Sequence, residues 1–131
     1  TLATLSGDAK EEKKNVDIKL AISAFISDDY IVEDRVRLEL YRRLSKTTQK
    51  DEVYKIEEEM EDRFGKPDLP TKQFLELIMI KILSLQKGIQ TISSYEMNIT
   101  FTKSDDTKET IKSPSKDDDD IIITTLKYLR K

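Results

Sequence analysis

Residues 34–70 read DRVRLELYRRLSKTTQKDEVYKIEEEMEDRFGKPDLP and predict two successive helices joined by a short connection. The first helix is expected over about Asp34 to Ser45, with Asp34 as a candidate N-cap. Its apolar residues recur at helical spacing and share one face, which predicts burial of that face. They are Val36, Leu40, Tyr41 and Leu44.

The second helix is predicted to begin after a Thr47-Thr48 connection that can cap it, with Asp51 in its first turn, where the helix dipole favours an acid. It should end near Phe64, because Gly65 suits a C-cap and Pro67 cannot continue the helix. Its predicted buried stripe consists of Val53, Ile56 and Met60.

Both flanks of this stretch predict further elements. Upstream, Val16 to Ser23 alternates apolar and polar residues, as expected of a strand with one buried face. Downstream, a largely apolar segment from Pro70 or Thr71 to Gly88 predicts a third and central helix. The remaining predicted elements are strands over Ile89–Ile92, Met97–Phe101 and Glu109–Ile111, and a helix from the Asp117–Asp120 run to about Leu129.

The predicted fold is α+β, with about four helices packed on a small mixed β-sheet. Residues 16–131 are expected to form a single domain. Residues 1–15 (TLATLSGDAKEEKKN) show no sustained period and are interpreted as a linker or flexible tail. Because the chain begins with Thr rather than Met, it is interpreted as a fragment of a longer protein.

The composition excludes several classes of function. With 23 Lys and Arg against 26 Asp and Glu, the net charge is −3, so any nucleic-acid contact must be local. The chain has no Cys for a thiolate site, no His as a base or metal ligand, and only three Gly, too few for a phosphate-binding loop. No apolar run is long enough to span a membrane, and we expect a soluble cytoplasmic protein.

The last turns of the second predicted helix carry Glu59, Asp62 and Arg63. Helical spacing places the two carboxylates on one side, with Arg63 one turn after Glu59. The structural alternative is that Arg63 pairs with Glu59 and satisfies the C-terminal carbonyls, while Phe64 anchors the core. Asp62 fits that alternative poorly, because an acid in the last turn opposes the helix dipole.

Two other charged clusters have functional and structural interpretations. Arg35, Arg37, Arg42 and Arg43 form a candidate nucleic-acid contact, with Arg35, Arg42 and Arg43 as the contact residues. Alternatively, they cover the flanks of an amphipathic helix and pair with Glu33, Asp34 and Glu39.

A metal-dependent or carboxylate-dependent hydrolase interpretation would use the run Asp117 to Asp120, or Glu59 or Asp62. The run lacks the ligand spacing of a calcium loop, and an acidic helix start explains it better. We expect no metal site and no catalytic residue.

Two collinear motifs carry a family resemblance. The first consists of FISDDYI at residues 25–31 and the RLELYRRL at 37–44 that follows it, and the second is EMEDRFG at 59–65. Over roughly Val16 to Phe101, this order resembles the C-terminal (TRCF) domain of the bacterial transcription-repair-coupling factor, Mfd. In that family a strand with a P-x-x-Y-I motif precedes the first helix, and the second closes on E-x-x-D-R-F-G.

The resemblance implies a non-catalytic, autoinhibitory domain of an ATP-dependent DNA translocase that removes stalled RNA polymerase and recruits nucleotide excision repair. Such a domain docks on the N-terminal UvrB-like module of the same chain and masks the recruitment of UvrA. The family's docking positions fall on Glu59, Asp62 and Arg63. The implied partners of the parent are RNA polymerase, UvrA and duplex DNA, and its ATP and Mg would bind outside this domain.

This chain departs from the family pattern at two places. Ser27 stands where the family usually has Pro, and Gly65 to Pro70 is two residues longer than the family's G-P-L-P. Beyond Phe101 the chain is shorter and more polar than the family norm. No functional residue is therefore carried over into that part.

Overall fold

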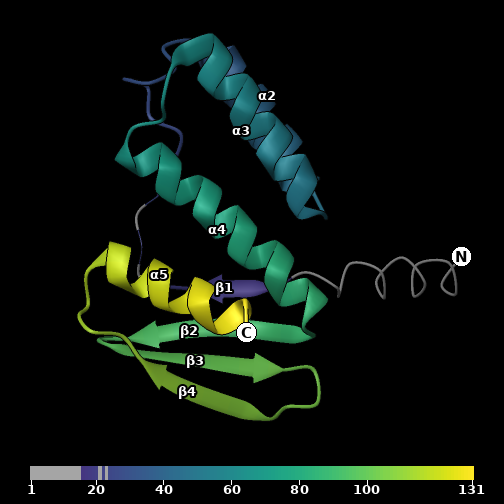
Figure 1. Cartoon of the computed structure of the whole chain (residues 1–131), viewed down its shortest axis with the longest axis vertical. Coiled ribbons are helices and arrows are strands. Elements are labelled where there is room, and N and C mark those ends of the chain that lie inside the picture. Colours follow the sequence, from purple (N-terminus) through teal and green to yellow (C-terminus); the bar gives the residue numbers. More distant parts are fainter. Residues whose placement is uncertain (1–15, 21, 23) are drawn as a thin grey trace, which may run out of the picture.

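The computed structural model describes residues 16–20, 22 and 24–131. The expected linker at residues 1–15 lies outside the described residues. Four helices and a four-stranded mixed sheet follow one another as β1, α2, α3, α4, β2, β3, β4 and α5 (Figure 1). The predicted α+β fold, with about four helices and a small mixed sheet, is therefore confirmed.

The sheet has the order β1-β2-β3-β4. β1 (Asp17–Lys19) pairs in parallel with β2 (Ile89–Tyr95), so the whole α2–α4 segment forms the connection between these two neighbouring strands. β3 (Asn98–Lys103) and β4 (Lys108–Lys112) add antiparallel strands. β1 is shorter than predicted: it ends at Lys19, and the Leu20 carbonyl oxygen accepts from the Ile22 amide at 2.8 Å rather than from a neighbouring strand.

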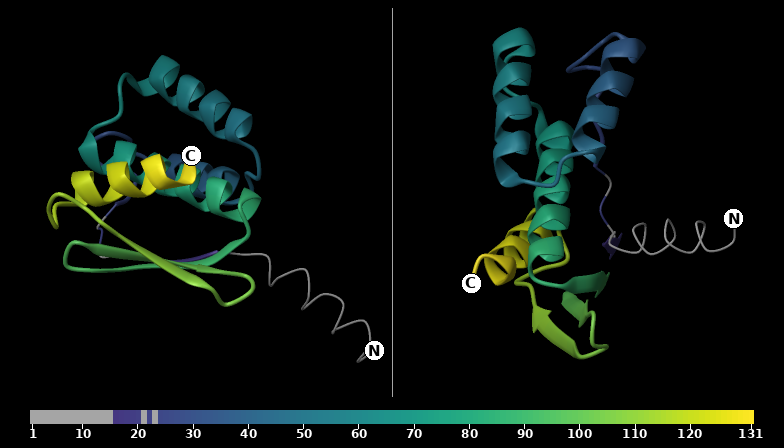
Figure 2. Two further views of the ribbon diagram at one scale, coloured as in Figure 1. Left: turned by 60° about the horizontal axis from the view of Figure 1, so that its bottom comes forward. Right: turned by 90° about the vertical axis from the view of Figure 1, so that its right-hand side faces the viewer.

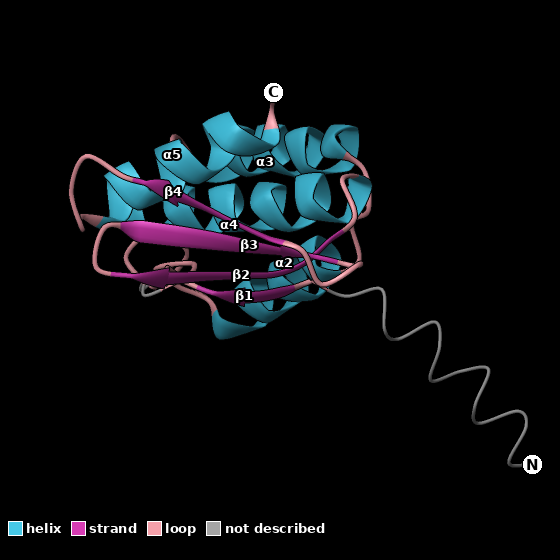
Figure 3. Cartoon of the chain, turned by 90° about the horizontal axis from the view of Figure 1, so that it is seen from below, coloured by secondary structure: helices cyan, strands magenta, loops and turns pink. Residues whose placement is uncertain are grey.

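α4 (Leu69–Gln86) is the central element, as predicted: it contacts α3, α5 and β2, and eight of its residues are buried. α5 (Asp118–Leu129) lies beside α4 over the same face of the sheet. The ring of Tyr128 on α5 stacks on the ring of Phe101, with centroids 4.0 Å apart. No described helix covers the opposite face of the sheet (Figure 3).

α2 (Asp34–Ser45) and α3 (Lys50–Phe64) form a helical hairpin that projects from α4 away from the sheet (Figures 1 and 2). The predicted inner faces are confirmed: Leu40 and Leu44 are buried on α2, and Val36 and Tyr41 are half-buried. On α3 the predicted stripe of Val53, Ile56 and Met60 is buried as well.

Two helix-start predictions were wrong by one or two residues. Asp34 is the first residue of α2 rather than its N-cap, which is Glu33, and the Asp34 carboxylate pairs with Arg37 instead. The Thr47-Thr48 connection does not cap α3. Gln49 is the N-cap instead. It forms a capping box with Glu52, whose carboxylate accepts from the Gln49 amide.

The end of α3 and the start of α4 follow from local chemistry. Gly65 has φ +87°, a backbone conformation that favours glycine, and its amide donates to the Glu61 carbonyl at 2.9 Å. Pro70 lies in the first turn of α4, which begins one residue earlier than predicted, at Leu69. Asp68 is the N-cap, since its carboxylate accepts from the Thr71 amide at 3.2 Å.

Candidate docking surface

Tyr30 joins the two family motifs. Its hydroxyl donates to the Gly65 carbonyl oxygen at 2.6 Å and lies 3.2 Å from the Met60 carbonyl oxygen. Its ring meets Phe64 edge to face, with centroids 5.9 Å apart. Tyr30 therefore satisfies the C-terminal carbonyls of α3, a task that the structural alternative assigned to Arg63. The pKa of Tyr30 is raised, and the largest cause is the burial of its phenol.

Glu59 lies in an ion-pair cluster of which the sequence predicted only the pair with Arg63. Arg43 of α2 donates to both Glu59 carboxylate oxygens at 2.8 Å, a bidentate pair. Arg63, one turn later on α3, reaches the same carboxylate at 3.4 Å, as the structural alternative predicted. Hydrogen bonding from Arg43 is the main cause that lowers the pKa of Glu59 to about 2.

Asp62 differs from Glu59 although it lies on the same helix. Its side chain is exposed, and within the described part of the chain it takes part in no ion pair. Arg63 is also exposed, and its guanidinium carbon lies 4.9 Å from the centre of the Phe64 ring. The structure thus brings Glu59 and Arg63 together and leaves the Asp62 carboxylate open to solvent.

The four arginines of α2 have separate surroundings. Arg37 donates to the carbonyl oxygens of Ile31 at 2.5 Å and Val32 at 3.1 Å, and it pairs with Asp34. Arg43 is engaged by Glu59. Arg35 and Arg42 are exposed and form no ion pair among the described residues. Of the four arginines of the candidate nucleic-acid helix, Arg37 and Arg43 are therefore already paired; the nucleic-acid contact itself stays a prediction.

Ser27, where the family usually has Pro, is buried and bonded. Its amide donates to the Thr71 hydroxyl at 3.0 Å, a bond that Pro has no hydrogen to make. Its hydroxyl accepts from the Asp29 amide at 3.0 Å. This departure from the family ties the first motif to the start of α4, next to the longer loop before Asp68.

The acidic run at residues 117–120 forms the N-terminal end of α5. Asp118, Asp119 and Asp120 occupy the first turn, where the dipole favours acids. Asp119 accepts from Gln73 at 3.1 Å and Asp120 from Ser115 at 2.6 Å. Over the described residues, no group of three or more acidic side chains is placed to hold a metal ion. Among the described residues, no helix has both the length and the apolar character needed to cross a membrane.

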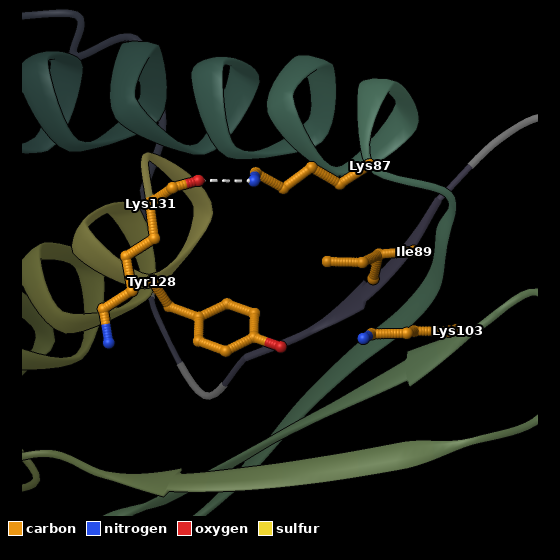
Figure 4. Close-up of a pocket in the computed structure, with 5 residues that line it drawn as sticks. All are labelled: Lys87, Ile89, Lys103, Tyr128 and Lys131. Atoms are coloured by element: carbon orange, nitrogen blue, oxygen red, sulfur yellow. Dashed lines mark hydrogen bonds between the residues drawn. The ribbon is translucent and has the colours of Figure 1, made fainter.

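A pocket of about 320 Å³ lies between the ends of α4, α5 and the sheet (Figure 4). It is lined by Lys87, Ile89, Lys103, Tyr128 and Lys131. Two of its polar groups are already used: the Lys87 ammonium donates to the Lys131 carbonyl oxygen at 2.9 Å, and the Tyr128 hydroxyl donates to Glu109 at 2.5 Å. Burial, followed by this bond, raises the pKa of Tyr128 to about 12. The first contact explains Lys87 as the partner of a carbonyl just beyond the end of α5.

Known proteins are similar to this chain in sequence and in fold. A family model described as the TRCF domain matches residues 20–113. A transcription-repair-coupling factor of Helicobacter pylori is 52% identical over 126 residues, which cover 96% of this chain but 13% of that protein. One of Mycobacterium bovis is 34% identical over 84 residues, covering 64% of this chain and 7% of that protein. The chain thus spans a small part of the length of these relatives.

A solved structure has a similar fold. It is described as the crystal structure of the C-terminal domain of transcription-repair coupling factor, with a TM-score of 0.65 and 24% identity. The match covers 69% of this chain and 56% of that one. The family model covers most of the chain, including both motifs joined by Tyr30. This chain therefore belongs to the TRCF domain family.

Proposed function

We propose that this chain is the C-terminal regulatory domain of a transcription-repair-coupling factor and that it docks on the N-terminal, UvrB-like module of the same parent through Glu59, Asp62 and Arg63. Docking masks the surface that recruits UvrA and restrains ATP hydrolysis and DNA binding by the parent. The domain itself is non-catalytic and acts in the cytoplasm in transcription-coupled repair of DNA damage. ATP and Mg bind elsewhere in the parent.

The observation that carries the proposal is the exposed Asp62 carboxylate. An acid in the last turn of a helix faces the negative end of the helix dipole, which costs stability unless a cation lies nearby. Among the described residues no cation pairs with it, although Arg63 is its neighbour in sequence. A basic group on a docked module would supply that cation.

Glu59 and Arg63 support the proposal through their geometry. Arg43 binds both oxygens of the Glu59 carboxylate, so this charge of α3 is held in a fixed position. Such preorganisation lowers the entropic cost of docking. Exposed pairs contribute only about 0.2 to 1 kcal/mol each, so a few of them suit a contact that must open when RNA polymerase is engaged.

The test is a titration of this chain against the separately prepared N-terminal module of the same parent. We expect weak, salt-sensitive binding, since the tether in the parent supplies an effective concentration of about millimolar. Glu59→Ala/Asp62→Ala/Arg63→Ala should abolish it. The matched control Asp17→Ala/Lys19→Ala/Asp117→Ala removes the same charges from the other end of the molecule and should bind as the wild type does. Equal binding by the first variant and the wild type would refute the assignment.

A second candidate function is a local nucleic-acid-binding module that uses the α2 helix. It is favoured by one observation, the exposure of Arg35 and Arg42 without carboxylate partners among the described residues. Salt-dependent binding of duplex or single strands by this chain would support it. Absence of binding at low salt would dismiss it.

A further inference from the structure

One face of α2 carries an unusual set of side chains. Leu38 is 60% exposed, although the helix has a well-formed apolar face elsewhere. Arg35 precedes it by three residues and Arg42 follows it by four, so the three side chains are neighbours on the helix surface. We refer to Arg35, Leu38 and Arg42 as the Arg-Leu-Arg face.

The two arginines of this face are free, unlike the other two on α2. Arg37 and Arg43 are each held by a carboxylate. The guanidinium groups of Arg35 and Arg42 form no hydrogen bond or ion pair within the described residues, although the Arg42 carbonyl oxygen accepts from the Ser45 hydroxyl. Two acids of α2 lie near them: Asp34 pairs with Arg37, and the exposed Glu39 follows Arg35 by four residues and precedes Arg42 by three. The face therefore keeps an excess of positive charge in a chain whose net charge is −3.

We propose that the Arg-Leu-Arg face binds an acidic protein segment that presents an apolar side chain between two carboxylates. Guanidinium groups match carboxylates in bidentate geometry, and burial of Leu38 supplies the apolar part of the contact. This contact is separate from docking through Glu59, Asp62 and Arg63, because it needs acids rather than bases on the partner.

Leu38 distinguishes a protein partner from nucleic acid. A phosphate backbone would satisfy the two arginines, but it offers no apolar group to the side chain between them. No aromatic side chain belongs to this face, so stacking on bases is not provided for. The negative charge of the whole chain also opposes approach of a duplex.

The experiment is a set of NMR titrations of the 131-residue chain. The probe is a capped helical peptide of about 18 residues with Glu three positions before and four positions after a central Leu. Matched probes replace both Glu by Gln, or the Leu by Ala, and a short DNA duplex supplies phosphates. The buffer holds about 50 mM salt, so that charge pairs are only partly screened.

We expect the acidic peptide to shift the NMR signals of the α2 amides around Arg35 to Arg42. Arg35→Gln/Arg42→Gln should lower the affinity for the acidic peptide about tenfold, and Leu38→Ala about fivefold. The wild-type chain should likewise bind the Gln probe and the Ala probe more weakly than the acidic peptide. All three substitutions are at exposed positions that tolerate good helix formers. Lys108→Gln/Lys112→Gln on β4 removes two charges from exposed residues of the sheet and should leave the affinity unchanged.

Three results would overturn the proposal. No shift of the α2 amides at millimolar peptide would show that the face does not bind such a segment. Loss of binding in the arginine variant without any effect of Leu38→Ala would reduce the contact to charge attraction. Shifts of the same amides by the duplex, at affinity equal to that of the peptide, would assign the face to nucleic acid.

Discussion

The hairpin of α2 and α3 and the layer formed by α4, α5 and the sheet are built differently. α4 buries eight of its 18 residues, whereas α2 buries two of 12 and α3 three of 15. The hairpin instead carries the Arg43–Glu59–Arg63 cluster and the exposed Asp62. Apolar burial concentrates in the layer that holds the fold, and charge concentrates in the part that we assign to docking.

The largest expected effect breaks the apolar layer. Phe101 is fully buried on β3 and stacks on Tyr128, so Phe101→Ala leaves a cavity between the sheet and α5. It should lower the free energy of unfolding by about 3 to 5 kcal/mol, measured by urea denaturation. Tyr95→Ala, at a side chain that is 75% exposed on β2, is the control and should cost under about 0.5 kcal/mol. Similar losses for the two variants would contradict the described core.

A smaller effect is expected where the hairpin is attached. Tyr30→Phe removes the hydroxyl that meets the Gly65 and Met60 carbonyls but keeps the ring beside Phe64. We expect a loss of about 1 to 2 kcal/mol by the same measurement. Tyr54→Phe, on the exposed side of α3, should change little. An unchanged stability in Tyr30→Phe would remove the proposed link between the two motifs.

The charged cluster should contribute less still. Because the pKa of Glu59 in the fold is about 2, below its ordinary value of 4.5, its stabilisation is fully present above about pH 4.5 and is lost as the pH falls toward 2. At neutral pH, Glu59→Gln should cost about 0.5 to 1 kcal/mol, because the pair is partly exposed.

The check is denaturation of Glu59→Gln and wild type from pH 7 to pH 2. The difference in stability between them should shrink over the acid part of this range. A double-mutant cycle with Arg43→Gln should assign most of the effect to that pair. A difference that stays constant down to pH 2 would contradict the ion pair.

The smallest predicted effect is a gain in the apolar layer. Burial is the first cause that raises the pKa of Glu76 on α4, so its charged form is disfavoured in the fold. This penalty is absent well below pH 4.5, grows as the pH rises above that ordinary value, and is complete above the raised pKa. Glu76→Gln should therefore stabilise the domain at neutral pH by up to about 0.5 kcal/mol, and a loss at pH 7 would contradict the described burial.

Most of the fold could be predicted from the sequence because the residues that end its helices act locally. Gly65 and Gly88 mark the ends of α3 and α4, and both have positive φ. The apolar stripes of α2, α3 and α5 follow helical spacing and are buried as expected. Caps were predicted less well, since the choice between Thr48 and Gln49 depends on how the Glu52 side chain reaches back.

The candidate site was predicted only in part. Local spacing predicts the Glu59–Arg63 pair, four residues apart on one helix. The Arg43–Glu59 pair joins residues 16 apart on two helices and depends on the packing of the hairpin, for which the sequence has no local signal. The contact of Tyr30 with Gly65 likewise exists only after the first motif has folded against the end of α3.

The most direct test of the account is an NMR footprint of the unlabelled N-terminal module on the labelled 131-residue chain. If docking uses the charged hairpin, the perturbed amides should cluster around Glu59, Asp62 and Arg63. Asp62→Asn should weaken the perturbation without lowering stability, since it removes an acid from the negative end of the helix dipole. Amides of β3 and β4 should stay unperturbed. A footprint centred on the sheet, or no footprint with the fold of both parts confirmed, would contradict the assignment of docking to the end of α3.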